Sequence, residues 1–560
     1  MQSIHEIDLT PKAGKQYWTG CLREWREEFI YFLMVDRFHD SDDRQPLRGA
    51  RHKGFGNPDQ LKKFCGGTLK GITHHLEYIH NLGCTALWLS PVFENNSDSY
   101  HGYAVQNYLQ VDPRFGANTD LEELVERAHK LDMRVFLDIV LHHSGDNWYY
   151  PEDQPYYYYK DVEFPFGGWR YKDRPIPIEL RDPKLYSRQG AIQNYDNYPE
   201  TRHGDFMSLK TFRNDDSEEA QRVQDILIRI HCYWMREVDI DGFRIDAVKH
   251  MGEVATSRFC SHIREYAYSL GKRNFFLFGE LVGPEEMYNR YVGSVTSTFM
   301  DYINVYYGLD SVLDFNLYHI LPDVIKGNSS PEHLITRYQS LRKLAAARGE
   351  YGEYLVTFLD NHDQVGQEEK FRFGNDATPE QIIAAVNFLL CAQGTPCIYY
   401  GTEQGLKGFE GQTHNGDWAV REAMFNLDDE STNLLDEESP IYKGIAHIAQ
   451  MRKSLAPLRF GRMYMCKVST DGVYFHYPDC PECLLAFSRV LHDDEILIAY
   501  NISSTRVSEE FVTVGHRGNG EFRFLFGDTG KVKVETHPDV KKNFVKLRLE
   551  PMQFVILSNI

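Results

Sequence analysis

Short apolar runs recur along the first three quarters of the chain, and stretches of helical periodicity separate them. The runs Phe29–Val35, Thr85–Ser90 and Arg134–Asp138 are continuous, which is typical of strands buried on both faces. Between these runs, residues 69–82 and a segment that begins at Thr119 repeat apolar residues three or four positions apart, which predicts helices. An alternation of strand and helix predicts parallel βαβ units.

The same alternation resumes after residue 213. A long helix is predicted over Glu218–Val238, and another over Gln381–Ala392 with Gly394 as its stop signal. Five further strands are predicted: residues 242–246, Asn274–Glu280, Val312–Phe315, Glu353–Asp360 and Pro396–Gly401. With the first three they make eight strands, so the sequence predicts an α/β fold with a closed (β/α)8 barrel.

Two other segments break this rhythm. Residues 144–213 are rich in Tyr, Pro and Gly and too long for a simple loop, which predicts a small inserted domain after the third strand. From residue 459 to 560 the pattern changes to short alternating strands, such as Val473–Phe475 and Glu495–Tyr500, which predicts an antiparallel β-sandwich. Residues 1–20 are expected to be an irregular lead-in, and residues 21–143 and 214–458 the barrel.

Length and charge limit the function classes. A chain of 560 residues is long enough for two or three units, and its net charge of −20 argues against nucleic acid and anionic membranes as partners. No apolar stretch is long enough to span a bilayer, and no signal peptide is visible at the start, so we expect a cytoplasmic protein. The 35 tyrosines can bind sugar faces or simply fill cores. The sequence leaves the oligomeric state open.

The 10 cysteines favour a reducing compartment. Several, such as Cys84, lie in apolar segments, as buried free thiols do. Cys480 and Cys483 form a lone Cys-x-x-Cys. We expect a turn there rather than a zinc site, although His476 and Cys466 could complete a set of four ligands.

Two strand ends carry candidate catalytic carboxylates. Arg244 and Asp246 alternate along one strand, so both side chains point the same way, and a fixed guanidinium lowers the pKa of a neighbouring acid. A second strand ends in Glu280. Two carboxylates at the C-terminal ends of parallel strands are what retaining glycoside hydrolysis requires. The alternative is two strand-end acids in unrelated ion pairs.

Four stretches in chain order resemble the signature regions of the α-amylase family of glycoside hydrolases. They are Asp138–His143, Gly242–Asp246, Phe278–Glu280 and Phe358–Asp363. Residues 100–103 and 399–404 are similar to two further family segments. The resemblance extends from about Phe29 to the C-terminal sandwich, nearly the whole chain, and it implies the barrel, the insert and the sandwich together.

The resemblance assigns roles that the chemistry of the residues supports. Asp246 would attack the anomeric carbon and form a covalent glycosyl-enzyme. Glu280 would protonate the departing oxygen and then deprotonate the incoming acceptor. Asp363 would bind sugar hydroxyls and favour the oxocarbenium-like transition state, and Arg244 would keep Asp246 ionised.

Further residues would bind the substrate. The resemblance implies hydrogen bonds from His143 and His362 to the sugar in the cleavage subsite, with Tyr103 stacked on its ring and His101 beside it. The pair Lys249 and His250 resembles the pair with which amylases and cyclodextrin-forming transferases hold the leaving-side or acceptor sugar. That pair favours α-1,4-glucans or malto-oligosaccharides; the alternative is a solvated basic tip.

No cofactor is expected to be required. Family members often hold calcium between barrel and insert through an Asn, an acid of the insert and the backbone carbonyl at the position of His250. Asp205 is the candidate acid here, but His142 stands where the family has Asn, and imidazole is a poor ligand for calcium. We therefore expect no calcium at that place and assign no metal ligand. A second place, near Asp40 and Asp42, is weakened because Thr68 stands where an acid often does, and it stays open.

The sequence thus predicts a retaining α-glycosidase acting on α-1,4-glucans or malto-oligosaccharides. Whether water or a second sugar captures the Asp246 adduct is left open, so an α-glucosyl or maltosyl transferase is the first alternative. A disaccharide-active isomerase of the same family is another. A non-catalytic sugar-binding member is the rival from a different class, and loss of the carboxylates would mark it.

Overall fold

A computed structural model describes most of the chain. It covers residues 1–19, 23–40, 61–97, 99–159, 162–292, 308–341, 345–346, 349–408, 416–425, 434–515, 520–537 and 542–560.

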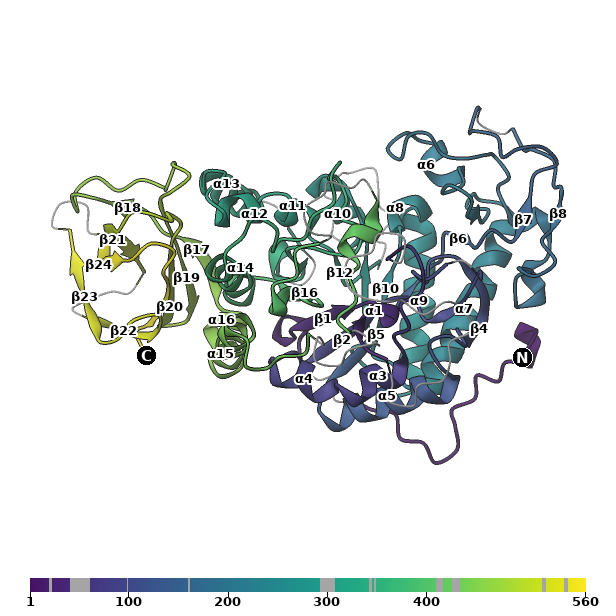
Figure 1. Ribbon diagram of the computed structural model, residues 1–560, viewed down its shortest axis with the longest axis horizontal. Helices are drawn as coiled ribbons and strands as arrows, with labels where there is room; N and C mark the ends of the chain where they lie inside the picture. The colour runs from purple at the N-terminus through teal and green to yellow at the C-terminus, as the bar shows by residue number, and fades with distance from the viewer. Residues whose placement is uncertain are drawn as a thin grey trace.

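Eight parallel strands form a barrel at the centre of the molecule (Figure 1). In chain order they are β1 (Ile30–Leu33), β2 (Ala86–Leu89), β5 (Arg134–Ile139), β10 (Gly242–Ile245), β11 (Phe276–Gly279), β12 (Ser311–Val312), β15 (Val356–Thr357) and β16 (Thr395–Tyr399). Neighbours pair in the order β12-β11-β10-β5-β2-β1-β16-β15. A bridge between Leu313 and Val356 closes the ring, and the Asp314 N–H donates to the Val356 carbonyl at 2.9 Å. The predicted barrel is confirmed.

Helices surround the barrel and bury the outer face of its strands. They include α3 (Leu69–His74), α4 (Leu76–Asn81), α5 (Asn118–Lys130), α7 (Glu218–Val238), α9 (Glu253–Ser269), α14 (Pro379–Cys391) and α15 (Pro440–Ser454). The prediction of one helix over residues 69–82 was wrong, because the backbone leaves the helical region at His75 and divides it into α3 and α4. The long helix over Glu218–Val238 is confirmed as α7, whose N-cap Ser217 accepts from the Ala220 N–H.

Between β5 and α7 the chain forms two small antiparallel pairs and a short helix. β6 (His143–Ser144) pairs with β9 (Lys210–Thr211), and β7 (Trp148–Tyr149) pairs with β8 (Gly168–Trp169). The aromatic side chains Trp148, Tyr150, Phe166, Trp169, Tyr186 and Phe212 pack on one another at ring-centroid distances of 4.7–6.0 Å. Many of the rings in this segment therefore form a core of their own. The short helix α6 (Glu200–His203) lies against α8 (Val248–Met251), which follows β10.

The C-terminal region is an antiparallel sheet of nine strands. They are β17 (Arg462–Met465), β18 (Val468–Ser469), β19 (Leu484–Leu491), β20 (Asp494–Asn501), β21 (Ser508–Val514), β22 (Glu521–Phe526), β23 (Lys531–Thr536), β24 (Asn543–Leu549) and β25 (Phe554–Ser558). The strand predicted over Val473–Phe475 is wrong: Asp471 accepts hydrogen bonds from the Val473 and Tyr474 N–H groups and folds this segment into a turn.

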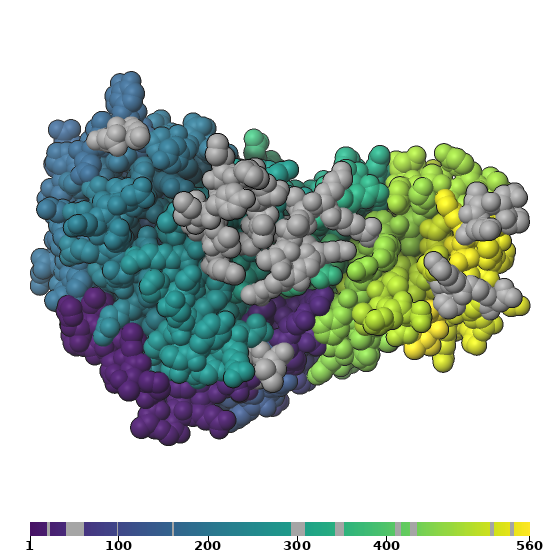
Figure 2. Space-filling model, turned by 180° about the vertical axis from the view of Figure 1, so that it is seen from behind, coloured from purple at the N-terminus to yellow at the C-terminus, as the bar shows by residue number. Residues whose placement is uncertain are grey.

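This sheet is buried on two faces. One face encloses its own core, to which Ala486, Leu497 and Val555 belong. The opposite face of the same strands packs on the barrel, and Phe487 meets Phe388 of α14 with ring centroids 5.2 Å apart. The sheet and the segment after β5 lie at opposite ends of the long axis, with the barrel between them (Figures 1 and 2). No helix among the described residues has the length and apolarity that a bilayer span needs.

Candidate active site

Backbone hydrogen bonds fix the two candidate carboxylates just beyond their strands. The Asp246 N–H donates to the Ile139 carbonyl, and the Glu280 N–H donates to the Ile245 carbonyl, each at 2.9 Å. Each bond extends the parallel ladder one residue past the end of β10 or β11. Both acids therefore stand on the rigid rim of the barrel rather than on a loop.

Ala247, directly after Asp246, has a left-handed backbone with φ of 49°. That conformation costs a non-glycine residue roughly 1–2 kcal/mol. It turns the chain from β10 into α8 and points the Ala247 N–H at the Glu280 Oε2, 3.1 Å away. The strained residue thus ties the strand end that carries one acid to the side chain of the other.

One buried guanidinium holds both carboxylates. Arg244 Nη1 lies 2.8 Å from Asp246 Oδ1, and Arg244 Nη2 lies 2.9 Å from Glu280 Oε2. Nη1 also donates to Asp138 Oδ1 at 2.8 Å, and the Trp88 Nε1 and Tyr103 Oη donate to Asp138 Oδ2. The arginine is therefore fixed from below by a fully buried acid while it aligns the two acids above it.

Exposure separates the supporting residues from the candidate reacting groups. The side chains of Arg244 and Asp138 are 1% and 0% exposed. Those of Asp246, Glu280 and Asp363 are 11%, 15% and 26% exposed. The three carboxylates are therefore the members of this network that solvent reaches.

Asp363 belongs to the same network through a second arginine. Asn361 Oδ1 accepts from the Asp363 and Gln364 N–H groups, which fixes the turn after β15. Arg421 Nη2 donates to Asp363 Oδ1 at 2.5 Å, and Arg421 Nε donates to the His362 carbonyl at 2.8 Å. Arg421 is thus bonded to the backbone and the side chain of this motif.

The histidines and Tyr103 link the two halves of the site. His362 Nε2 lies 2.6 Å from Tyr103 Oη and 3.2 Å from Asp363 Oδ2. The rings of Tyr103 and His362 stack with centroids 5.3 Å apart, and those of His101 and Tyr103 with centroids 5.7 Å apart. His143 Nε2 lies 3.1 Å from the Tyr103 carbonyl. Tyr103 therefore contacts all three histidines, and His362 joins this group to Asp363.

The pKa values of the two rim acids differ. Burial raises the pKa of Glu280 to about 8, although Arg244 acts to lower it, and Asp246 and Asp363 raise it further. Burial raises the pKa of Asp246 to about 6, again against Arg244, with Asp138 and Asp363 adding to the rise. Arg244 thus has the predicted lowering effect, but burial outweighs it. Glu280 holds its proton at neutral pH, whereas Asp246 is mostly ionised.

The pKa values of Asp363 and of the histidines are lowered rather than raised. Burial acts to raise the pKa of Asp363, but His362, Arg421 and Arg244 outweigh it and lower the pKa to about 2. Burial lowers the pKa of His362 and His101 to about 3 and of His143 to about 4. Asp363 is therefore an anion beside neutral imidazoles, each able both to donate and to accept a hydrogen bond.

Lys249 and His250 lie on α8, where the segment after β5 covers them. Lys249 Nζ forms an ion pair with Asp196, and its side chain is 14% exposed. His250 Nδ1 contacts the carbonyl and the hydroxyl of Thr201. The exposed ring of Tyr195 lies 6.0 Å from the imidazole. The pair is held in place by this segment and is not a solvated basic tip.

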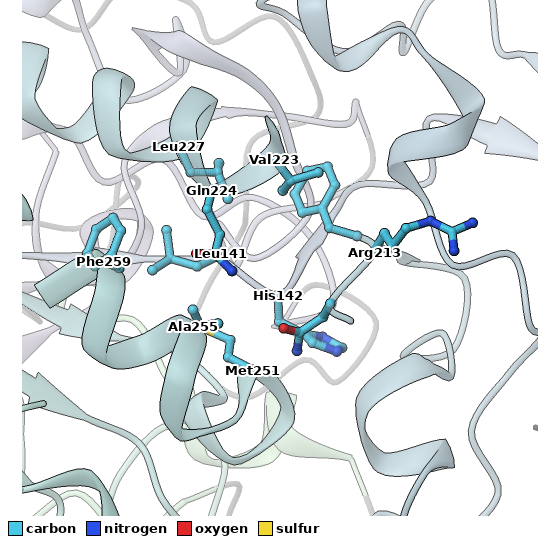
Figure 3. Close-up of a pocket in the computed structure, with 11 residues that line it drawn as sticks. Leu141, His142, Arg213, Val223, Gln224, Leu227, Met251, Ala255 and Phe259 are labelled. Carbon is cyan, nitrogen blue, oxygen red and sulfur yellow. The ribbon is translucent and has the colours of Figure 1, made fainter. Parts of the chain in front are cut away.

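The candidate calcium ligands are occupied by protein donors. Asp205 is fully buried, and its carboxylate accepts from Tyr150 Oη at 2.7 Å and from the Thr211 N–H at 2.9 Å. The His250 carbonyl accepts from Asn214 Nδ2 at 2.7 Å. A cavity of about 20 Å³ lies beside His142 (Figure 3), which is room for one water, and no carboxylate lines it. A hard cation prefers several oxygen ligands, so these residues do not fit calcium.

The second candidate calcium place is only partly described. Asp40 lies within the described residues, whereas Asp42 lies outside them. The Thr68 hydroxyl accepts from the Gly71 N–H and caps α3. Thr68 is therefore engaged in starting a helix.

Comparison with known proteins shows to which family the chain belongs. The model of the α-amylase catalytic domain matches residues 32–442. The chain belongs to the α-amylase family. It is 29% identical to an α-amylase of Streptomyces lividans over 91% of the chain, and it spans 58% of that protein's length. It is 27% identical to a cyclomaltodextrin glucanotransferase of Klebsiella oxytoca over 85% of the chain and 70% of that protein.

Solved structures agree with this family. The structure of the α-amylase of Geobacillus thermoleovorans complexed with acarbose is similar with a TM-score of 0.71 and 26% identity, over 96% of this chain and 99% of that one. The cyclomaltodextrin glucanotransferase CldA, described as having a three-domain ABC distribution, gives a TM-score of 0.70 and 25% identity, over 95% and 99% of the two chains. Amylases and glucanotransferases are thus about equally similar to this chain.

Sequence reasoning missed Arg421 as a site residue. It lies 58 residues after Asp363, in an irregular segment without hydrophobic periodicity, so no local signal marks it.

The turn at Cys480 and Cys483 is present, since the Cys483 N–H donates to the Cys480 carbonyl, but the two sulfurs also form a disulfide. Cys466 is buried in the core of the C-terminal sheet and contacts Ser488 instead.

Proposed function

We propose that this protein is a retaining α-glycosidase that acts on α-1,4-glucans or malto-oligosaccharides through a covalent intermediate on Asp246. One observation carries the proposal: a single buried guanidinium, that of Arg244, holds Asp246 and Glu280 together at the solvent-reached rim of the barrel. A close pair of carboxylates is the arrangement of retaining enzymes, whose two carboxyl groups lie about 5–5.5 Å apart.

In the first step Asp246 attacks the anomeric carbon while the glycosidic bond breaks. Glu280 gives its proton to the departing oxygen, so the leaving chain departs as a neutral alcohol and Asp246 becomes a glycosyl ester. In the second step Glu280 takes a proton from water, the water oxygen attacks the anomeric carbon, and the carboxylate of Asp246 is released. The configuration is retained because it is inverted twice.

The electrostatics support this division of roles. Glu280, with a pKa of about 8, carries a proton to donate at neutral pH, and Asp246, with a pKa of about 6, is available as an anion. Asp363, with a pKa of about 2, remains charged beside the positive charge that develops at the anomeric centre. The non-catalytic alternative has no observation in its favour, because all three carboxylates are in place.

The proposed substrate class rests on Lys249 and His250. Thr201 takes the Nδ1 hydrogen of His250, so Nε2 keeps a lone pair and accepts a hydrogen bond from a sugar hydroxyl. The exposed ring of Tyr195 beside it offers a face to a sugar. An α-glucosyl or maltosyl transferase remains the second candidate, because glucanotransferases and amylases resemble this chain to a similar extent. No observation favours a disaccharide isomerase.

The proposal includes no cofactor at the joint between the barrel and the segment after β5. Asn214 binds the His250 carbonyl there, and Asp205 is satisfied by Tyr150 and Thr211. In this proposal these hydrogen bonds take the place of a cation at the joint. A cytoplasmic location also stays a prediction, which fractionation of the source cells would test.

A time course of products from maltoheptaose tests the function. Proton NMR should show that the first products have the α configuration, and shorter malto-oligosaccharides should accumulate. Products longer than maltoheptaose, or cyclic ones, would indicate the transferase. Release of β-configured sugars would overturn the retaining mechanism.

A further inference from the structure

The Cys480–Cys483 disulfide has a third donor group beside it. Within the part of the chain that the structure describes, a single group of Asp, Glu, His and Cys side chains brings three donor atoms within 4.8 Å of one another: Asp479, Cys480 and Cys483. Asp479 and Cys480 are exposed, so solvent and small solutes reach the group from their side, whereas Cys483 is more deeply buried. It lies in the loop before β19, far along the chain from the carboxylates of the barrel.

We propose that this loop is a redox-controlled metal site: reduction of the Cys480–Cys483 disulfide creates a site for a thiophilic divalent cation, with Asp479 as the third ligand. Zinc fits this donor set, since thiolates and carboxylates bind it tetrahedrally, and a water takes the fourth position.

The loop needs to move little between its disulfide form and its metal-bound form. With Zn–S bonds of about 2.3 Å, two sulfurs of a tetrahedral site are about 3.8 Å apart. The cysteine Cα atoms are 5.5 Å apart, so side-chain rotation alone can separate the sulfurs to that extent. The backbone of the loop is fixed by other bonds: the Cys483 N–H donates to the Cys480 carbonyl at 3.3 Å, and the Ile502 N–H donates to the Cys483 carbonyl at 3.4 Å.

A backbone hydrogen bond to Cys483 and the exposure of Cys480 distinguish this pair from the other cysteines. The Cys480 N–H lies 3.1 Å from the Cys483 sulfur, and a backbone donor of this kind stabilises a thiolate. The seven free cysteines of the described chain are all buried, and burial raises the pKa of Cys466, the one nearest in sequence, to about 12. Those thiols are poor nucleophiles and poor ligands.

The chemistry balances with an ordinary thiol as the reductant. Two molecules of a small thiol supply two electrons and two protons to the disulfide and leave joined as their own disulfide. The freed Cys480 and Cys483 thiols each lose a proton to solvent when the cation binds. A reducing compartment thus favours the metal-bound loop, and an oxidising one favours the disulfide.

Cobalt titration tests the site with a spectroscopic readout. The whole protein is reduced with a dithiol, freed of it without air, and titrated with Co²⁺. We expect one equivalent to give the thiolate-to-cobalt charge-transfer absorption, zinc to displace it, and the unreduced protein to give none. Absence of this absorption in the reduced protein would overturn the proposal.

Three variants locate the ligands. The double variant Cys480→Ser/Cys483→Ser should give no charge-transfer band. Asp479→Asn should keep the band but bind at least about ten-fold more weakly, since losing a ligand costs more than about 1.4 kcal/mol. Asp493→Asn, an exposed acid of the same domain, is the matched control and should bind like the parent. A band that survives the double variant, or unchanged affinity in Asp479→Asn, would refute the site as described.

Discussion

Replacement of Arg421 by alanine tests whether this arginine positions Asp363 for the transition state or only binds the sugar. Arg421 is 6% exposed and makes three hydrogen bonds, to Asp363 Oδ1, the His362 carbonyl and Tyr100 Oη. Its bond to Asp363 joins two charged groups, and a hydrogen bond to a charged group contributes about 1.5–3 kcal/mol. If Asp363 acts in the transition state, that loss corresponds to a fall of about 10- to 150-fold in kcat/KM.

The assay is steady-state hydrolysis of maltoheptaose over a range of pH. We expect kcat and kcat/KM of Arg421→Ala to fall together, because the lost interaction serves the transition state. Removal of a cation raises the pKa of Asp363 from about 2, but the acid limb of the profile, which Asp246 sets near pH 6, should stay in place. Arg421→Lys should recover part of the rate, since a lysine replaces the charge but not the three bonds.

A matched control is Arg258→Ala, which removes an arginine paired with Asp225 on the outside of the barrel. It should retain parental kcat and KM. If Arg421→Ala raises KM and leaves kcat unchanged, Arg421 binds sugar uniformly in the ground and transition states, and the positioning argument is refuted. Circular dichroism of each variant separates a local loss from unfolding.

Other expectations follow from the same geometry. Asp246→Ala should abolish turnover with an unchanged circular dichroism spectrum; full activity would contradict its role. The profile of kcat/KM should be bell-shaped with half-maximal values near pH 6 and pH 8: below the first Asp246 becomes protonated and is no nucleophile, and above the second Glu280 loses the proton it must donate. A chelator should leave activity and Tm unchanged, whereas Asn214→Ala should cost about 1–3 kcal/mol of unfolding free energy because the buried His250 carbonyl loses its donor; a large effect of the chelator would show that the protein holds a cation, at the joint or at the second place near Asp40.

The positions of the barrel strands and of the long helix were predictable because their patterns depend on burial, but strand lengths were not, since the run predicted over Glu353–Asp360 is a strand only at Val356–Thr357. Strands of a closed parallel barrel are covered on both faces, so each reads as a continuous apolar run, and the run ending in Asp138 gave its strand nearly to the residue. The break at His75 was not predictable, since apolar residues keep helical spacing through it. The false strand at Val473–Phe475 has an apolar residue at each end, but the Asp471 side chain competes for its backbone hydrogens.

The site was predictable only as far as its residues lie on strand ends. Asp246 and Glu280 follow β10 and β11 directly, so their proximity follows from the parallel order of the strands. Arg421 lies outside any periodic element, and nothing in its neighbours indicates a bond to Asp363. The net direction of the Asp246 pKa shift was also hidden, because the sequence shows the arginine but not the degree of burial that outweighs it.

Trapping the glycosyl-enzyme tests the central claim most directly. An α-maltosyl fluoride needs no proton on its leaving group, and Glu280→Gln cannot activate water, so the first step proceeds and the second stalls. Mass spectrometry of the digested protein should then find a maltosyl unit on the peptide that contains Asp246. No adduct on any peptide, or an adduct on Asp363 instead, would contradict the account.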